Sequence, residues 1–324
     1  MANLSIIGAG AWGSALSVAL ADNFERIFLH TFTQAEADNL QPKHPALARK
    51  YPKNVELTFD LSLTQKSQSV LIATPSYGFF ATLKTLAPLL KTEQPLAWAT
   101  KGFDTQRQCL LHESFEDIFP KRLGCAVSGP SFAAELAENK PTAVAVASKD
   151  KKTRDYWAKA LRTNTLRTYT NDDIIGVEIG GAVKNVLAIA AGIAAGLGFG
   201  ANTQAALITR GLAEMIRLGV ALGADKSTFN GLSGLGDLVL TCSDDLSRNR
   251  RFGKQLAKNL NTQQALENVG ATVEGLNSLQ LVLLIAKKHQ VEMPICTQVL
   301  QVTEGKISPI EAVNYLLSRD LVGE

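Results

Sequence analysis

Near its N-terminus the chain reads Leu4-Ser5-Ile6-Ile7-Gly8-Ala9-Gly10-Ala11-Trp12-Gly13, and this segment predicts the fold of the first half. A short apolar run typical of a buried strand leads into G-x-G-x-x-G, and a helix-forming run follows from Ser14 to Leu20. Glycines here permit a tight turn, close approach of the backbone to a pyrophosphate, and close packing of helix on strand. The helix N-terminus then faces the anion. The pattern predicts a dinucleotide-binding turn whose cofactor contacts include Gly8, Gly10, Ala11, Trp12 and Gly13.

Further apolar runs follow at helix-sized intervals, over 26–30, 69–73, 96–99, 124–127 and 142–147. Strands that alternate with helices indicate a mostly parallel, doubly wound sheet, and ligands of such sheets bind beyond the carboxyl ends of the strands. Polar or Gly/Pro elements stand at those ends, namely Thr74-Pro75-Ser76, Thr100-Lys101-Gly102 and Ser128-Gly129-Pro130-Ser131. We therefore expect an α/β domain of the Rossmann type over residues 1–175.

The end of the second strand reads His30-Thr31-Phe32-Thr33-Gln34, and the first acid after it is Glu36. An NAD-specific site usually has an acid at this strand end to bind the ribose 2′-hydroxyl, whereas an Arg accommodates the 2′-phosphate of NADP. Residues 30–34 contain neither. The sequence predicts NAD or NADP as the cofactor and leaves the preference open.

The pattern changes after Asn171, where long apolar periodic stretches replace the strand-like runs. These stretches cover 181–223, about 250–260, 274–288 and 309–318. They predict an all-helical second domain over 176–324. No residue from Asn185 to Thr209 is charged, and a helix there places five residues on one stripe: Gly181, Asn185, Ala188, Gly192 and Gly196. Small side chains on this stripe let another backbone approach closely.

Lys184 stands near the start of this apolar stretch, where burial of an uncompensated ammonium would be expensive. Two structural interpretations compete with a functional one. A membrane span of about 20 apolar residues is one, but the run is rich in Gly and Ala and lacks the Leu/Ile/Phe density of a good span. The other is a lysine that reaches the surface from a core helix. We expect no membrane insertion, and the rest of the chain decides between the two roles of the lysine.

A second polar constellation lies between the helical stretches. The glycine-rich run from Gly231 to Gly236 forms a turn that aims Asp237 inward, and Ser247-Arg248-Asn249 begins a helix. Backbone N–H groups and a planar guanidinium together make a good phosphate clamp. An exposed basic helix start is the simpler interpretation of one Arg, but Thr241 in the same short stretch favours a binding site.

Length and composition set broader bounds. A chain of 324 residues is long for one hydrophobic core, so two domains are expected. The net charge is 33 − 30 = +3, which suits a small anionic substrate and gives no indication of nucleic acid. Four cysteines without a C-x-x-C pair predict reduced thiols in a cytoplasmic protein, and a packed thiol is the expected role of Cys242. Four scattered histidines predict no metal site.

Taken together, the motifs occur in an order that resembles one family, the bacterial NAD(P)-dependent glycerol-3-phosphate dehydrogenases. The resemblance covers nearly the whole chain and rests on the turn at 8–13 together with Thr100-Lys101-Gly102, Ser128-Gly129-Pro130-Ser131-Phe132-Ala133, Gly181-Ala182-Val183-Lys184-Asn185, Gly236-Asp237-Leu238, Thr241-Cys242, Ser247-Arg248-Asn249-Arg250 and Val273-Glu274-Gly275. It departs at the end of the second strand, where many family members have an Arg.

The resemblance implies reversible hydride transfer between nicotinamide and dihydroxyacetone phosphate, giving sn-glycerol 3-phosphate for phospholipid synthesis. It implies Lys184 as the general acid/base with Asp237 as its catalytic partner. The implied substrate contacts are Lys101, Gly129, Lys184, Asn185, Asp237, Thr241, Ser247, Arg248 and Asn249. Beyond the glycine turn, the implied cofactor contacts are His30, Phe32, Pro75, Lys101, Ser131, Ala133, Arg248, Thr272 and Glu274.

The chemistry of these residue types agrees with that assignment. A reduced ketone gathers negative charge on its oxygen and needs a proton donor poised near neutral pH. Burial, and Lys101 as a nearby like charge, would lower the pKa of Lys184, while Asp237 would raise it and hold the ammonium. Two other functions stay open at this point: a β-hydroxyacid dehydrogenase of similar architecture, and a cofactor-binding regulator without turnover. We also expect a homodimer.

Overall fold

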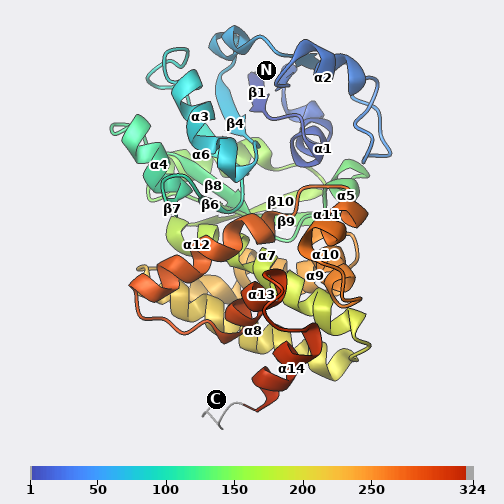
Figure 1. Ribbon diagram of the computed structural model, residues 1–324. Coiled ribbons are helices and arrows are strands. Elements are labelled where there is room, and N and C mark those ends of the chain that lie inside the picture. The colour runs from blue at the N-terminus through green and yellow to red at the C-terminus, as the bar shows by residue number, and fades with distance from the viewer. Residues whose placement is uncertain (1, 319–324) are drawn as a thin grey trace. The chain divides into compact units, whose positions relative to one another are not determined.

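The computed structural model describes residues 2–318. The chain forms two compact units, one that extends to Glu178 and one that begins at Ile179. The first unit contains the sheet, and within residues 179–318 every regular element of the second unit is a helix (Figure 1). An α/β domain followed by a helical domain confirms the expected fold class. The predicted boundary at 175/176 falls inside one helix, α7 (Ile174–Gly196).

Eight strands form the sheet of the first unit in the order β10-β9-β8-β5-β4-β1-β2-β3. Neighbouring strands are parallel except β8 and β9, which pair antiparallel, so β9 and β10 run against the rest. The bounds are β1 Asn3–Ile7, β2 Arg26–His30, β3 Val55–Thr58, β4 Ser69–Ile72, β5 Leu96–Trp98, β8 Cys125–Ser128, β9 Thr142–Ala147 and β10 Leu166–Asn171. The predicted runs correspond to six of these strands, whereas β3 and β10 were not predicted.

Two hydrophobic clusters contain the side chains that point away from the sheet of the first unit. One cluster joins sheet residues to α1 (Ala11–Ala19) and α6 (Lys151–Leu161), with Leu16 and Trp157 fully buried. The other joins the sheet to α3 (Ser76–Leu86) and α4 (Leu111–Ile118), with Phe79 and Phe115 fully buried. Helices therefore cover both faces, as a doubly wound sheet requires. The remaining elements are α2 (Gln34–Asn39), α5 (Ala133–Ala137), short 3₁₀ turns at Ala21–Asn23 and Leu61–Lys66, and the hairpin of β6 (Phe103–Asp104) and β7 (Cys109–Leu110).

The second unit is built on the greater part of α7, from Ile179 onward, and on α8 (Ala201–Ala221). A 3₁₀ turn at Lys226–Asn230 and a π-helical turn at Leu232–Gly236 lead into the shorter helices, which are α9 Asp237–Ser243, α10 Arg248–Leu256, α11 Thr262–Val269, α12 Glu274–Lys288, α13 Pro294–Thr303 and α14 Pro309–Leu317. The predicted stretch 274–288 matches α12 residue for residue. The sequence did not predict α11 and α13 as separate helices.

Helix α7 is apolar and long enough to cross a bilayer, but 94% of its most apolar window is buried inside the protein. Its small-residue stripe packs against α10, as the sequence predicted. A Cβ atom on Gly192 would lie 2.0 Å from the carbonyl oxygen of Arg250, and one on Gly253 would lie 2.1 Å from that of Ile189. Only glycine allows two backbones to approach this closely.

Candidate active site

The turn between β1 and α1 has the geometry that a pyrophosphate needs. Gly8 has φ +110° and donates its N–H to the carbonyl of His30, 3.0 Å away. A Cβ on Gly13 would lie 1.9 Å from the carbonyl oxygen of Gly8, so the first turn of α1 packs directly on the loop. Gly10 is the N-cap, and a Cβ there would meet nothing within 4 Å. The loop therefore packs closely against the first turn of α1, and the space next to Gly10 is open.

The start of α1 also fits an anionic cofactor electrostatically. Its first turn contains no acid, and glycine at the N-cap has no side chain to occupy the first amide groups. Positive partial charge at a helix N-terminus favours a phosphate. The indole Nε1 of Trp12, in this same turn, is buried and has no hydrogen-bond partner within the described part of the chain. Ala11 and Trp12 are half-buried.

Polar groups gather after β5 and β8, as the strand-end argument predicted. Lys101 follows β5, and its Nζ donates to the carbonyl oxygen of Gly129, which follows β8, at 3.1 Å. Ser131 Oγ donates to the same carbonyl at 2.9 Å. Ala133 begins α5, and Pro75 caps α3 after β4. The structure brings Lys101, Gly129 and Ser131 together within the first unit.

The end of β2 presents its residues differently. The imidazole of His30 is buried, and its Nε2 lies 3.1 Å from Ser5 Oγ. Burial lowers the pKa of His30 to about 4, only partly opposed by the charge of Asp60, so the ring is neutral near pH 7. The side chain of Phe32 is 93% exposed. The backbone carbonyl of His30 thus binds the glycine turn, whereas the ring of Phe32 is exposed to solvent.

The second unit holds the lysine that the sequence singled out. Lys184 Nζ lies 2.5 Å from Asp237 Oδ1 and 3.0 Å from Thr241 Oγ1. The Lys184 side chain is 8% exposed and that of Asp237 is 1% exposed. Thr241 stands one turn after Asp237 on α9 and donates its hydroxyl to the backbone carbonyl of Asp237 at 2.6 Å. The ammonium is therefore buried, paired and oriented by two side chains of one helix turn.

Close backbone packing positions Asp237 next to Lys184. Gly180 lies one turn before Lys184 on α7, and a Cβ there would be 2.2 Å from the carbonyl oxygen of Ser233. Ser233 belongs to the π-helical turn that leads directly into Asp237. Any larger residue at Gly180 would push this turn away from α7. The Asp237 side chain does point inward, since it is only 1% exposed.

Asn185 and Asn249 form a second polar contact next to the lysine. Asn249 Nδ2 donates to Asn185 Oδ1 at 3.0 Å, and Asn249 Oδ1 accepts from the backbone N–H of Gly275 at 2.8 Å. Both amide side chains are buried. Helices α7, α10 and α12 are thus linked through two asparagine side chains. Glu274, the first residue of α12, is half-buried, and Thr272 just before it is exposed.

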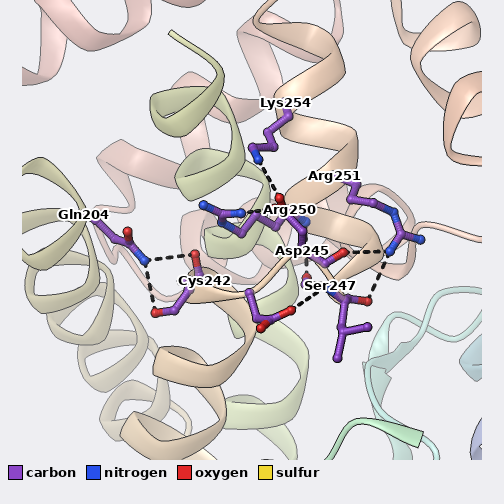
Figure 2. A network of polar contacts seen from close by, with 10 residues as sticks. Gln204, Cys242, Asp245, Ser247, Arg250, Arg251 and Lys254 are labelled. Atoms are coloured by element: carbon purple, nitrogen blue, oxygen red, sulfur yellow. Dashed lines mark hydrogen bonds and ion pairs between the residues drawn. The ribbon is translucent and has the colours of Figure 1, made fainter. Parts of the chain in front are cut away.

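Three of the four cations of α10 contact the turn before the helix, and Figure 2 shows these contacts around Asp245. Arg250 pairs with Asp245 Oδ1, and Lys254 Nζ donates to Asp245 Oδ2 at 2.6 Å. Arg251 donates to the backbone carbonyl of Asp245 at 2.7 Å. These three cations therefore hold the turn before the helix. The guanidinium of Arg248 is exposed and, among residues 2–318, has no hydrogen-bond or ion-pair partner.

Ser247 is the N-cap of α10 and accepts the backbone N–H of Arg250 at 3.2 Å. Its hydroxyl oxygen is thus used by the helix itself. Lys101 belongs to the first unit and Lys184 to the second. The structure brings together Lys184, Asp237 and Thr241, and separately Asn185 and Asn249. The roles of all these residues toward substrate and cofactor remain predictions.

Sequence reasoning missed a buried acid, Glu178. Its Oε1 accepts Trp98 Nε1 at 2.9 Å and the backbone N–H of His112 at 3.1 Å, and its Oε2 lies 2.7 Å from His112 Nδ1. An acid within an apolar helical run was the available signal, but its partners stand 80 and 66 positions away. Cys242, by contrast, is the packed thiol that was expected: burial raises its pKa to about 12.

Comparison with known proteins places this geometry in a family. Residues 3–154 match the family model described as NAD-dependent glycerol-3-phosphate dehydrogenase N-terminus, and residues 173–314 match the corresponding C-terminus. A glycerol-3-phosphate dehydrogenase [NAD(P)+] from Ruthia magnifica subsp. Calyptogena magnifica is 66% identical and covers 99% of each chain. Its counterpart from Colwellia psychrerythraea is 44% identical over 98% of each chain.

A solved structure agrees with these matches. Glycerol-3-phosphate dehydrogenase from Coxiella burnetii superposes with a TM-score of 0.94 at 39% identity, and the match covers 98% of this chain and 99% of that one. The resemblance that the motifs suggested is confirmed. On the strength of the two family models and these full-length relatives, the chain belongs to the NAD-dependent glycerol-3-phosphate dehydrogenase family.

Proposed function

We propose that this protein interconverts dihydroxyacetone phosphate and sn-glycerol 3-phosphate with NAD(P)H as the reductant. Family membership supports the reaction, because relatives that match over their full length carry this activity in their names. One observation in the structure supports it most: a buried lysine ammonium held by Asp237 and Thr241. A ketone reduction needs such a proton donor in a site that excludes water.

The glycine turn would hold the nicotinamide cofactor, which when bound would supply a hydride for C2 of the ketone. Lys184 donates the proton to the ketone oxygen, and in the reverse direction it takes the proton from the hydroxyl. Asp237 pairs with the ammonium and fixes its direction, and Thr241 provides a second acceptor for it. An acid poised in this way typically contributes about 10²–10⁴-fold to a rate.

In this proposal Arg248 binds the substrate phosphate. Arg248 stands at the first position of α10 with an exposed guanidinium, while Asn249 is fixed beside Asn185. A planar fork next to a helix N-terminus suits a phosphate dianion. Phosphate binding energy at Arg248 would then orient the carbonyl toward Lys184.

The decisive measurement is the loss of reduced-nicotinamide absorbance with dihydroxyacetone phosphate, in parallel with NADH and NADPH, for the parent and for Lys184→Ala. We expect turnover in the parent and its loss in the variant. Cofactor binding, measured by fluorescence titration, should be retained in Lys184→Ala. Absence of turnover with both coenzymes, despite cofactor binding, would overturn the assignment of the substrate.

Arg251 on the same helix provides a matched control for Arg248. Arg248→Gln should raise KM for dihydroxyacetone phosphate by about 10–100-fold, the effect of losing charge-assisted hydrogen bonds. Arg251→Gln removes the same charge from a side chain that is engaged with the carbonyls of Asp245 and Leu246, and it should leave KM nearly unchanged. Equal effects of the two substitutions would mean that general charge, not a defined contact, attracts the phosphate.

Two other functions make different predictions in the same assay. A β-hydroxyacid dehydrogenase would turn over a carboxylate keto acid and would not depend on Arg248 for a phosphate. A cofactor-binding regulator would bind NAD(H) or NADP(H) with no turnover in the parent. The family assignment favours the phosphate substrate over both.

We further propose that the enzyme is a cytoplasmic homodimer that supplies glycerol 3-phosphate for phospholipid synthesis. Free thiols at all four cysteines fit a reducing compartment. The first half of α8 supports a dimer, because its apolar residues are incompletely covered: Ala205 and Ala206 are exposed, and Leu207 and Ile208 are half-buried. Sedimentation equilibrium tests the dimer, and a molecular mass near 35 kDa at micromolar concentration would exclude it.

A further inference from the structure

The end of β2 contains a carboxylate that its sequence position does not reveal. Thr33 is the N-cap of α2, and its hydroxyl accepts the backbone N–H of Glu36 at 3.2 Å. The Glu36 side chain in turn reaches back, and its Oε2 accepts the backbone N–H of Phe32 at 2.7 Å. Although Glu36 lies on the helix, its negative charge therefore stands two residues past the last residue of β2.

This strand end adjoins the glycine turn. β1 and β2 pair in parallel with Ile7 opposite His30, and the carbonyl of His30 accepts the N–H of Gly8. In dinucleotide-binding folds an acid at the end of the second strand accepts the 2′-hydroxyl of the adenosine ribose. The Glu36 carboxylate occupies the place of that acid, and it reaches the place from a different position in the chain.

The charge of Glu36 is also felt on the α1 side of the turn. Tyr51 donates its hydroxyl to Ser14 Oγ on α1 at 3.0 Å. Burial raises the pKa of Tyr51 and the charge of Glu36 raises it further, against the hydrogen bond to Ser14. His44 responds to the same carboxylate, although burial lowers its pKa overall. Glu36 thus lies within electrostatic range of groups that pack against the helix of the turn.

No cation neutralises this carboxylate within residues 2–318, because Glu36 forms no ion pair with a described Lys or Arg. One of its oxygens is fixed by the Phe32 amide, and the other keeps lone pairs for a second donor. A ribose hydroxyl can donate to this oxygen. A 2′-phosphate in the same place would bring two further negative charges next to an unneutralised one.

We propose that Glu36 determines the coenzyme: its carboxylate accepts the ribose 2′-hydroxyl of NADH and repels the 2′-phosphate of NADPH. The proposal rests on the function given above and selects one of the two coenzymes that the sequence left open. The preference arises from folding, because the reach of Glu36 back to Phe32 requires the Thr33 cap and the first turn of α2.

The test compares Glu36→Gln with a control on the same helix. Gln keeps an oxygen that can accept the Phe32 amide, removes the charge, and replaces the second oxygen with an NH₂ group. Asp38→Asn also removes one negative charge from α2, but the Asp38 carboxylate accepts Gln34 Nε2 at 2.7 Å and not the strand end. For each protein, kcat/KM is measured with NADH and NADPH, and Kd for NAD⁺ and NADP⁺ is measured by calorimetry.

The parent should prefer NADH in both measurements. Glu36→Gln should lower the ratio of kcat/KM with NADH to kcat/KM with NADPH about tenfold or more, mainly through tighter NADPH binding. Asp38→Asn should leave this ratio within about twofold of the parent value. A parent that prefers NADPH, or an unchanged ratio in Glu36→Gln, overturns the proposal. An NADPH preference would instead direct attention to Lys43, Arg49 and Lys50 in the loop after α2. Failure of the reaction itself appears separately, as coenzyme discrimination in Kd without turnover.

Discussion

Helix α7 contains two buried charges six positions apart, and they differ in what surrounds them. Glu178 receives three hydrogen bonds from rigid donors in the first unit, an indole N–H, a backbone N–H and an imidazole ring. Its neighbour Trp98 stacks on Phe115, with ring centroids 5.1 Å apart, in an aromatic core. Glu178 therefore has the environment of an acid whose task is to fix structure.

Lys184 is equally buried, but its partners are the short polar side chains of Asp237 and Thr241 on α9. Asn185 and Asn249 form a further polar contact beside it. Burial and pairing are thus common to both charges and do not distinguish them. The distinction is that Glu178 is set into aromatic and backbone groups, whereas Lys184 is set into a cluster of polar side chains of the kind that a substrate meets.

The largest expected effect comes from breaking the lysine pair. Lys184→Met should lower kcat by about 10²–10⁴-fold and destabilise the fold by about 3–5 kcal/mol, because Asp237 stays buried without a counter-charge. Adding Asp237→Asn should restore most of the stability and none of the turnover. Urea unfolding and single-turnover kinetics on the same samples provide the measurement. A single variant as stable as the parent would show that Asp237 is not desolvated.

The Glu178 cluster should show the opposite division between stability and activity. Glu178→Gln keeps the side-chain shape but loses charge-assisted bonds to Trp98 and His112, at a cost of about 2 kcal/mol. Turnover per folded molecule should stay unchanged, with urea unfolding and active-site titration as the two readouts. A large fall in kcat at normal KM would refute the comparison, because Glu178 would then act on Lys184 through the helix.

The comparison also explains which parts of the molecule were readable from sequence. The central strands and α7 are buried and apolar, and their patterns predicted them. β3 and β10 are the two edge strands, and in β10 only Leu166 is fully buried, so its sequence Leu-Arg-Thr-Tyr-Thr-Asn gave little apolar signal. Edge strands that face solvent lose the periodicity on which such predictions rest.

The site was readable where its residues are close in sequence. Asp237, Thr241 and Arg248 fall in one short stretch, and the family resemblance implied that Asp237 is the partner of Lys184. Glu178 was not readable, since its partners come from β5 and α4 and only the folded sheet brings them to α7. The Glu36 carboxylate was missed for a local reason: sequence distance from β2 concealed a side chain that turns back along the chain.

The smallest expected effect is a pH dependence from His112, which sharpens the contrast between the two pairs. Burial lowers the pKa of His112, but the hydrogen bond and charge of Glu178 outweigh burial, and the net pKa lies above the ordinary value of 6.5. The folded protein then holds this proton more tightly than the unfolded chain. Stability from this group is complete below pH 6.5 and is lost as the pH rises through the folded-state pKa.

Urea unfolding between pH 6.5 and about 7.5, where few thiols of the unfolded chain are ionised, measures this effect. His30 acts in the opposite direction and only near pH 6.5, because burial lowers its pKa to about 4 in the fold, against an ordinary value of 6.5, and most of its destabilisation therefore falls on the acid side. His112→Asn should abolish the decline above pH 6.5, and Glu178→Gln should weaken it. The Lys184–Asp237 pair should contribute nothing to the part of the pH dependence of the unfolding free energy that His112→Asn removes. A decline that persists in His112→Asn would mean that another group titrates there, and that the Glu178 cluster holds a neutral imidazole.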